Sequence, residues 1–355
     1  MTGAAGPAKR AIVTAPLRLL LDGDALVANW RWLAARQPGA ACGAAVKADG
    51  YGLGAPQVVA RLAAGGCRDF FVATWDEAAQ LGPLPGGIAL SVLHGVRGED
   101  MAAALASPAR PVLNSAAQVA RWREAGGGAC DVMVDTGINR LGLRPEEACS
   151  GLLDGLAIET LISHLACADE PGHPLNARQR EAFAAVVPQV RARRASLANS
   201  AGVLLGPDYG FGLTRPGLAL YGGRPVAGME AIRQVVRPAA QVIQCRTVRA
   251  GETVGYGATF RAAADTAAAV LNIGYADGYF RAFAGNGAAF AGDRRCPLIG
   301  RVSMDMVVVG TDGADVREGD WLTIEYDLPA ASAATGLSQY ELLTGLGQRF
   351  ERHWI

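Results

Sequence analysis

Short apolar runs alternate with longer segments of helical periodicity across the first two thirds of this 355-residue chain. The runs have the length of strands, and several of the intervening segments end at Gly or Pro. The predicted strands of this part are 42–46, 70–73, 88–92, 111–113, 131–135, 159–164, 195–199 and 213–215. The predicted helices include 23–35, capped by Asp22, and then 55–64, 98–106, 115–125, 145–154 and 176–194. Eight strands with intervening helices predict an α/β fold of the (β/α)8 TIM-barrel type, which we favour over a doubly wound sheet.

The pattern changes after residue 236. Helical periodicity ends, and short runs of β character follow between turns that contain Gly and Asp. These runs are 240–249, 267–273, 296–302, 305–310 and 321–325, and a last amphipathic helix is predicted at 338–347. We therefore predict two domains, a barrel over residues 1–236 and a mainly β domain over 237–355.

The amino-acid composition indicates which binding partners and which cellular compartment to expect. Half of the residues are apolar and 19% are charged, which is typical of a globular protein. Lys plus Arg equals Asp plus Glu at 33 each, so the charge balance favours neither nucleic acid nor an anionic membrane as a partner. The seven cysteines are scattered without a C-x-x-C pair, which favours a reducing compartment. No run approaches the roughly 18 apolar residues of a membrane helix, and we predict a cytoplasmic location.

The stretch AAVKADGYGLG, residues 44–54, carries the first candidate chemistry. A short buried strand delivers Lys47 into a glycine-rich turn, and Tyr51 follows four residues later. An exposed lysine beside an ordinary turn is the alternative. The glycines do not have the spacing of a dinucleotide fingerprint.

Further polar residues follow other predicted strands. Lys47, Arg140, His164, Ser200 and Arg215 all fall at or just past the carboxyl ends of strands, where barrel enzymes build their active sites. The segments after the seventh and eighth strands are the usual phosphate-binding place of such barrels. Ser200 offers a hydroxyl there, and Gly217 and Leu218 offer backbone N–H groups. Ser200 as a helix N-cap is the alternative. No cluster of ligands predicts a metal, and no nucleophile elbow predicts a hydrolase.

Eight motifs in order along the chain resemble those of the alanine racemases, a family of pyridoxal-phosphate-dependent barrel enzymes. They are VKADGYGLG (46–54), DTGINRLG (135–142), SHLACADE (163–170), NSAG (199–202), RPGLALYG (215–222), VGYGATF (254–260), IGYADGY (273–279) and GRVSMD (300–305). The resemblance implies an isomerase that interconverts L-alanine and D-alanine, with pyridoxal 5'-phosphate as cofactor. It further implies D-alanine biosynthesis for peptidoglycan precursors, although degradation of D-alanine stays open.

The resemblance also implies roles for single residues. Lys47 and Tyr256 are the two catalytic bases, one on each face of the substrate. Arg215 faces the pyridine nitrogen and leaves it neutral, because a guanidinium keeps its own proton, and His164 orients Arg215. The implied cofactor-binding residues are Lys47, Tyr51, Arg140, His164, Ser200, Arg215, Gly217, Leu218 and Trp354. The implied substrate-binding residues are Arg140, Met304 and Tyr275.

Two positions depart from the family pattern. Many relatives carry a carbamylated lysine seven residues before the arginine, where this chain has Met133. Our hypothesis is that Asn139, a bound anion, or both position Arg140 instead. The family often ends with a tyrosine that reaches the phosphate, and we expect Trp354 at that place, either binding the phosphate or packing.

The family places the tyrosine of the β domain in the barrel mouth of the other subunit, which implies a head-to-tail homodimer with shared active sites. A racemase of broad specificity or one specific for serine is the nearest alternative. A non-catalytic pyridoxal-phosphate-binding barrel is the non-enzyme alternative, and the second domain with Tyr256, Tyr275 and Met304 argues against it.

Overall fold

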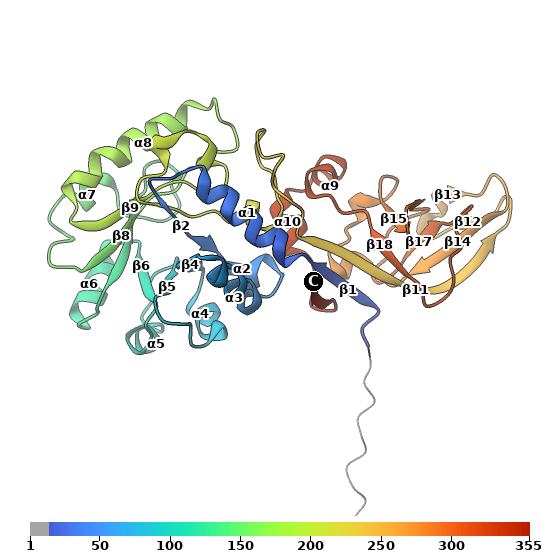
Figure 1. Ribbon diagram of the computed structural model, residues 1–355, viewed down its shortest axis with the longest axis horizontal. Coiled ribbons are helices and arrows are strands. Elements are labelled where there is room, and N and C mark those ends of the chain that lie inside the picture. Colours follow the sequence, from blue (N-terminus) through green and yellow to red (C-terminus); the bar gives the residue numbers. More distant parts are fainter. Residues whose placement is uncertain (1–13) are drawn as a thin grey trace, which may run out of the picture. The chain divides into compact units, whose positions relative to one another are not determined.

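The computed structural model describes residues 14–355, and these form two compact units (Figure 1). The barrel unit contains residues 21–237, 326–345 and 354–355. The β unit contains residues 238–325 and 346–353 together with the described residues up to Leu20. The chain passes from the barrel unit to the β unit between Arg237 and Pro238, next to the predicted boundary after residue 236. The segment 326–345 was predicted in the β domain but belongs to the barrel unit.

A curled sheet of parallel strands forms the centre of the barrel unit. Its seven strands are β3 (Ala44–Ala45), β4 (Asp69–Val72), β5 (Ala89–Val92), β6 (Arg110–Leu113), β7 (Cys130–Met133), β8 (Ile158–Ile162) and β9 (Ala192–Ser196). A separate parallel pair joins β10 (Leu213–Thr214) to β2 (Ala41–Cys42). The pair bridges the two ends of the sheet, because Gly212 donates to Ala195 O at 3.0 Å and Ala41 donates to Gly212 O at 3.1 Å. The predicted (β/α)8 fold class is confirmed.

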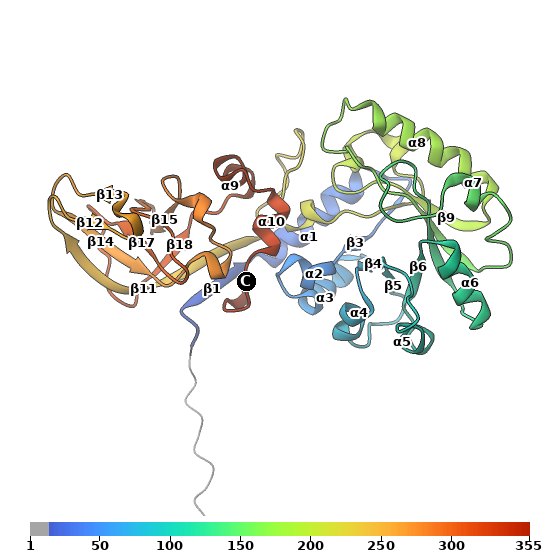
Figure 2. The ribbon, with the colours of Figure 1, turned by 180° about the vertical axis from the view of Figure 1, so that it is seen from behind.

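Helices surround this sheet, as both ribbon views show (Figures 1 and 2). They are α1 (Gly23–Ala35), α2 (Lys47–Tyr51), α3 (Ala55–Gly65), α4 (Trp75–Leu81), α5 (Met101–Ala106), α6 (Ala116–Glu124), α7 (Pro145–Ala148) and α8 (Pro174–Val186). The unit also contains α9 (Leu328–Thr335) and α10 (Gln339–Thr344). The short 3-10 helices of the unit are η1 (Val187–Gln189), η2 (Gly202–Leu204), η3 (Pro207–Tyr209) and η4 (Leu218–Tyr221). Asp22 caps α1 as predicted, since its carboxylate accepts the Ala25 N–H at 2.7 Å.

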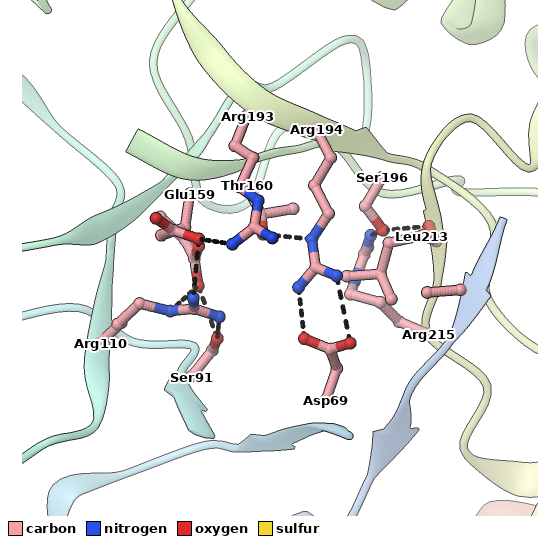
Figure 3. Close-up of polar contacts among 12 residues, drawn as sticks. Asp69, Ser91, Arg110, Glu159, Thr160, Arg193, Arg194, Ser196, Leu213 and Arg215 are labelled. Atoms are coloured by element: carbon pink, nitrogen blue, oxygen red, sulfur yellow. Dashed lines mark hydrogen bonds and ion pairs between the residues drawn. The ribbon is translucent and has the colours of Figure 1, made fainter. Parts of the chain in front are cut away.

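A layer of charged side chains lies inside the barrel (Figure 3). Arg194 of β9 makes a two-pronged ion pair with Asp69 of β4, and its Nε donates to Thr160 at 3.3 Å. Ser91 donates to the buried Asp131 at 2.5 Å, and the Arg110 guanidinium lies 3.6 Å from the same carboxylate. Burial raises the pKa of Asp131, while Arg110 opposes this shift. The observed β9 begins at Ala192, within the predicted helix 176–194 and earlier than the predicted strand 195–199.

The β unit is built on antiparallel pairing. The strands of its sheet, which differ widely in length, are β1 (Leu17–Leu21), β11 (Val236–Val248), β14 (Thr266–Leu271), β15 (Ala288–Ala291), β16 (Arg294–Pro297), β17 (Val307–Gly310), β18 (Trp321–Ile324) and β19 (Glu351–Trp354). A hairpin adds β12 (Thr253–Val254) and β13 (Phe260–Arg261). The 3-10 helices are η5 (Tyr256–Ala258), η6 (Tyr275–Asp277) and η7 (Arg281–Phe283).

Candidate active site

A cavity of about 460 Å³ opens at the carboxyl ends of the barrel strands. Seven of the residues predicted for cofactor binding line it: Lys47, Tyr51, Arg140, His164, Ser200, Arg215 and Gly217. A cavity of about 570 Å³ beside α4 and α5 has no titratable lining residue. The cavity at the strand ends is therefore the candidate active site, because it combines an apolar wall with convergent polar groups.

Lys47 is the principal nucleophile candidate of this cavity. The sequence contains only two lysines, Lys47 and Lys9, so Lys47 is the single lysine within residues 14–355. Burial lowers its pKa, and the positive charges of Arg140 and Arg215 lower it further, while Glu77 acts in the opposite direction. A lowered pKa increases the fraction of neutral amine, which is the form that attacks a carbonyl group.

Arg215 lies at the floor of the cavity and is buried. Its guanidinium donates to Ser163 O at 2.7 Å and to the Ser196 hydroxyl, which in turn donates to Leu213 O at 2.5 Å (Figure 3). Burial lowers the pKa of Arg215 to about 10, so the side chain remains protonated at neutral pH. It therefore presents a fixed positive charge to the cavity.

His164 contacts this guanidinium and is held neutral. Its Nδ1 lies 3.4 Å from an Arg215 Nη atom, while burial and the nearby cations lower the pKa of His164 to about 3. Because a neutral Nδ1 that faces a guanidinium N–H must accept, the ring proton lies on Nε2. The buried Gln179 fixes the surrounding loop, since it donates to His164 O at 2.9 Å and accepts the Ala166 N–H at 2.8 Å.

Ser200 is held in place by two backbone N–H groups. Its Oγ accepts the Gly217 N–H at 2.9 Å and the Ala219 N–H at 3.2 Å, so both lone pairs are used. Its hydroxyl proton is thus free to be donated to an acceptor in the cavity. The Gly217 N–H is committed to Ser200 and is not the free donor that the sequence analysis expected. Leu218 lies outside the cavity lining, and its N–H has no acceptor among residues 14–355.

Tyr51 adds a second hydroxyl beside this group. Its ring stacks on Tyr221 with centroids 4.6 Å apart, and the Tyr221 hydroxyl donates to Ala45 O at 2.8 Å. A Cβ added to Gly217 would lie 2.2 Å from the Tyr51 hydroxyl oxygen. This closeness requires glycine at 217 and brings Tyr51, Ser200 and η4 to one side of the cavity.

Arg140 is positioned through its backbone. One oxygen of the Asp135 carboxylate accepts the N–H groups of Gly137 and Asn139, and the other accepts the Arg140 N–H at 3.0 Å. Met133 lines the cavity, as expected from its place in β7. No hydrogen bond between the side chains of Asn139 and Arg140 occurs in the described part of the chain. Positioning of Arg140 by a bound anion therefore stays a prediction.

The structure favours the packing alternative for Trp354 and places Tyr340 at the cavity. The indole of Trp354 packs under the Arg61 guanidinium at 4.2 Å and does not line the cavity. Tyr340 of α10 does, with its ring centroid 6.3 Å from that of Tyr51. The sequence carried one signal for this residue: the family often ends with a tyrosine that reaches the phosphate, and Tyr340 is the last tyrosine of the sequence. His94 also lines the cavity.

The remaining predicted residues lie together in the β unit. Tyr275 donates its N–H to Ser303 O and Ala276 donates to Met304 O, both at 3.0 Å. A Cβ added to Gly300 would lie 2.7 Å from Val254 O. Three motif segments, 254–259, 273–278 and 300–306, are therefore neighbours within this unit. Tyr256 and Met304 are exposed, at 72% and 52%.

Two kinds of feature are absent from residues 14–355. No helix there is both long enough and apolar enough to span a membrane. No group of three or more His, Cys, Asp or Glu side chains there could hold a metal ion.

The barrel carries a desolvated lysine, a buried arginine and a serine with a free hydroxyl proton at its strand ends. This combination is typical of barrel enzymes whose cofactor has a carbonyl group that reacts with lysine. The chain belongs to the alanine racemase family: the N-terminal and C-terminal domain models of this family match residues 21–225 and 235–354. This confirms the resemblance found in the motifs.

Individual relatives support the same assignment. The alanine racemase of Acidiphilium cryptum is 42% identical over 348 residues, which cover 94% of this chain and 97% of the relative. The catabolic alanine racemase of Agrobacterium fabrum is 41% identical and covers 95% and 92%. The crystal structure of alanine racemase from Bartonella henselae with covalently bound pyridoxal phosphate superposes with a TM-score of 0.88 at 34% identity, covering 97% of this chain and all of the other.

Proposed function

We propose that the chain interconverts L-alanine and D-alanine, with pyridoxal 5'-phosphate attached to Lys47 and with Tyr256 of a second subunit as the opposite base. The observation that carries this proposal is the placement of the single described lysine, with its lowered pKa, beside a protonated arginine and an anion-binding serine. When bound, the cofactor withdraws electrons from the substrate α-carbon and makes its proton removable.

The residues of the cavity fit this cofactor. Ser200 would donate its free hydroxyl proton to the phosphate, and Tyr51 and Tyr340 line the same cavity. Arg215 would hold the pyridine nitrogen as a permanent donor, which would leave that nitrogen without a proton of its own. Leu218 supports the phosphate through its backbone N–H. We assign to Tyr340 the role that the sequence analysis expected at Trp354.

Racemisation requires acid–base groups on both faces of the substrate. Lys47 holds or removes the α-proton on one face, and Tyr256 serves the other. We propose that Arg140, Tyr275 and the backbone at Met304 bind the substrate. The exposure of Tyr256 and the grouping of its segment with those of Tyr275 and Met304 support a head-to-tail homodimer in which each site takes residues from both subunits.

Mixing two inactive variants tests the shared sites. Purified Lys47→Ala and Tyr256→Phe should each be nearly inactive, whereas unfolding them together and refolding them should restore activity. Random pairing makes about half of the dimers hybrid, each with one intact site of two, so recovery should approach about a quarter of the wild-type rate. Formation of D-alanine from L-alanine on a chiral column is the measurement, and L-serine as a second substrate reports specificity.

Each variant refolded alone is the control for this mixture. If the mixture stays as inactive as the single variants although dimers form, Lys47 and Tyr256 of one site come from the same chain. A fully monomeric mixture would equally contradict the proposed assembly.

Gly217→Ala should weaken cofactor binding. The new methyl group would lie 2.2 Å from the Tyr51 hydroxyl and must displace it from the phosphate wall. We expect the Kd for pyridoxal phosphate to rise about tenfold, which corresponds to ~1.4 kcal/mol. Titration of apoprotein followed by absorbance measures this. Gly98→Ala, where an added Cβ meets nothing within 4 Å, should leave the Kd unchanged; equal Kd values for the two variants would refute the arrangement.

We also propose a cytoplasmic enzyme that supplies D-alanine for peptidoglycan precursors. All seven cysteines are free thiols, which fits a reducing compartment. Because a relative with 41% identity is named as catabolic, the direction of use is tested by whether deletion of the gene makes growth depend on added D-alanine.

A further inference from the structure

The backbone that follows Lys47 adopts an uncommon left-handed turn. Ala48, Asp49, Gly50 and Tyr51 all have positive φ, at 53°, 53°, 63° and 57°. A left-handed helical conformation is unfavourable for residues other than glycine, because the Cβ atom crowds the following carbonyl oxygen, and three of these four are not glycine. The surroundings must therefore hold this turn in place.

Part of that support comes from within the segment. The N–H groups of Gly50, Gly52 and Gly54 donate to Val46 O, Ala48 O and Asp49 O at 2.8 to 2.9 Å. The Asp49 carboxylate accepts the Ala55 N–H at 2.8 Å and so secures the far end of the turn. These contacts tie the turn to itself and to α3, but they do not tie its lysine end to the barrel.

Glu77 of α4 supplies the missing connection. One oxygen of its carboxylate accepts the Ala48 N–H at 2.7 Å, and the other accepts the Ala73 N–H at 2.6 Å. Ala73 directly follows β4, so a single carboxylate joins the turn to the carboxyl end of that strand. On the other side of Lys47, the Val46 N–H donates to Phe71 O at 2.8 Å, also in β4. Both backbone neighbours of Lys47 are thus anchored to the same strand end.

The usual role of a glutamate at this helix position does not account for these contacts. Thr74 caps α4 by accepting the Glu77 N–H at 3.2 Å, and the spacing Thr-x-x-Glu is that of a capping box. In a capping box the glutamate bonds the N–H of the cap residue itself. Here the carboxylate instead bonds Ala73 and reaches across to Ala48.

We propose that Glu77 is a positioning residue for Lys47: it holds the left-handed turn against the end of β4 and thereby aims the lysine amine into the cavity. This inference rests on the proposed role of Lys47. Glu77 has a second, electrostatic effect, because its negative charge opposes the lowering of the Lys47 pKa by burial and by Arg140 and Arg215. Substitutions separate the two effects.

The test follows imine formation between apoprotein and added pyridoxal phosphate by absorbance, as a function of pH, together with amide hydrogen exchange of the peptide 46–54. Glu77→Ala removes both anchors, so we expect imine formation to slow about tenfold or more and the peptide to lose protection. Glu77→Gln keeps the size but removes the charge and one of the two acceptor oxygens. The pH midpoint of imine formation should therefore move to lower pH, and the rate should fall less than in Glu77→Ala. Glu77→Asp should restore part of the rate.

Asp76→Asn is the matched control, because Asp76 is exposed on the same helix and, within residues 14–355, its carboxylate accepts from the nearby Gln80 at 2.6 Å and not from the turn. It should leave the rate, the midpoint and the protection unchanged. Wild-type rates and midpoints in both Glu77→Gln and Glu77→Ala would overturn the proposal, and Glu77→Gln decides alone if Glu77→Ala does not fold. An imine that persists in Lys47→Arg would instead overturn the role of Lys47, so the two failures are distinguishable.

Discussion

Lys47→Ala should lose the covalent attachment of pyridoxal phosphate and lower racemisation by roughly 10³-fold or more, because it removes both the anchor and one acid–base group. No other lysine within residues 14–355 can replace it. The cavity should still bind the cofactor without a covalent bond, since Ser200, Arg215 and the aromatic wall remain. Absorbance spectra before and after borohydride reduction, followed by mass mapping of the labelled peptide, measure the attachment.

Lys9→Arg is the natural control, because it removes the only other lysine amine in the sequence. The variant should keep the wild-type spectrum and rate. A reduced label on the peptide that contains Lys9, or a Lys47→Ala protein that still turns over alanine at the wild-type rate, would contradict the assignment.

Tyr256→Phe should lower racemisation by roughly 10²–10⁴-fold in both directions, because proton transfer on one face is lost. L-alanine and D-alanine have equal free energies, so the loss in kcat/KM must be the same whichever enantiomer is supplied. A difference between the two faces of the substrate must therefore be measured by exchange of the α-proton with solvent. In D2O the variant should still exchange the α-proton of one enantiomer, which we expect to be D-alanine, through Lys47. Mass spectrometry of recovered alanine measures this exchange.

The converse experiment uses Lys47→Ala under the same conditions, where exchange of D-alanine should disappear. Tyr209→Phe serves as the control, because Tyr209 does not line the cavity, and it should keep exchange of both enantiomers. If Tyr256→Phe loses exchange of both enantiomers equally, or keeps both, the two groups do not serve opposite faces.

Local pattern predicted the barrel because each strand–helix unit carries its own periodicity. The helix cap at Asp22 and the placement of Lys47, His164, Ser200 and Arg215 at strand ends also follow from short stretches of sequence. The carboxyl ends of parallel strands meet at one rim, so a linear pattern is enough to gather these residues. For this reason most of the polar groups that line the cavity could be predicted from the sequence.

Other parts of the site could not be predicted from the local sequence pattern. Tyr340 reaches the cavity from α10, far along the chain, while Trp354 at the expected place packs on Arg61 instead. The ion pair of Arg194 with Asp69 joins strands that are distant in sequence, and the strand that contains Arg194 begins inside the predicted helix 176–194. Contacts of this kind depend on which parts of the folded chain meet. Hydrophobic periodicity and secondary-structure propensity do not indicate which distant segments come together.

The sequence alone determined the fold class, the family and the lysine that is available for imine chemistry. Only the tertiary structure decided that Ser200 keeps a free hydroxyl proton, that His164 is neutral, and that Glu77 connects the left-handed turn to β4. The physical reason is that hydrogen-bond satisfaction and pKa values are set by burial and by neighbours in space, whereas strands, helices and motifs are set mainly by neighbours along the chain.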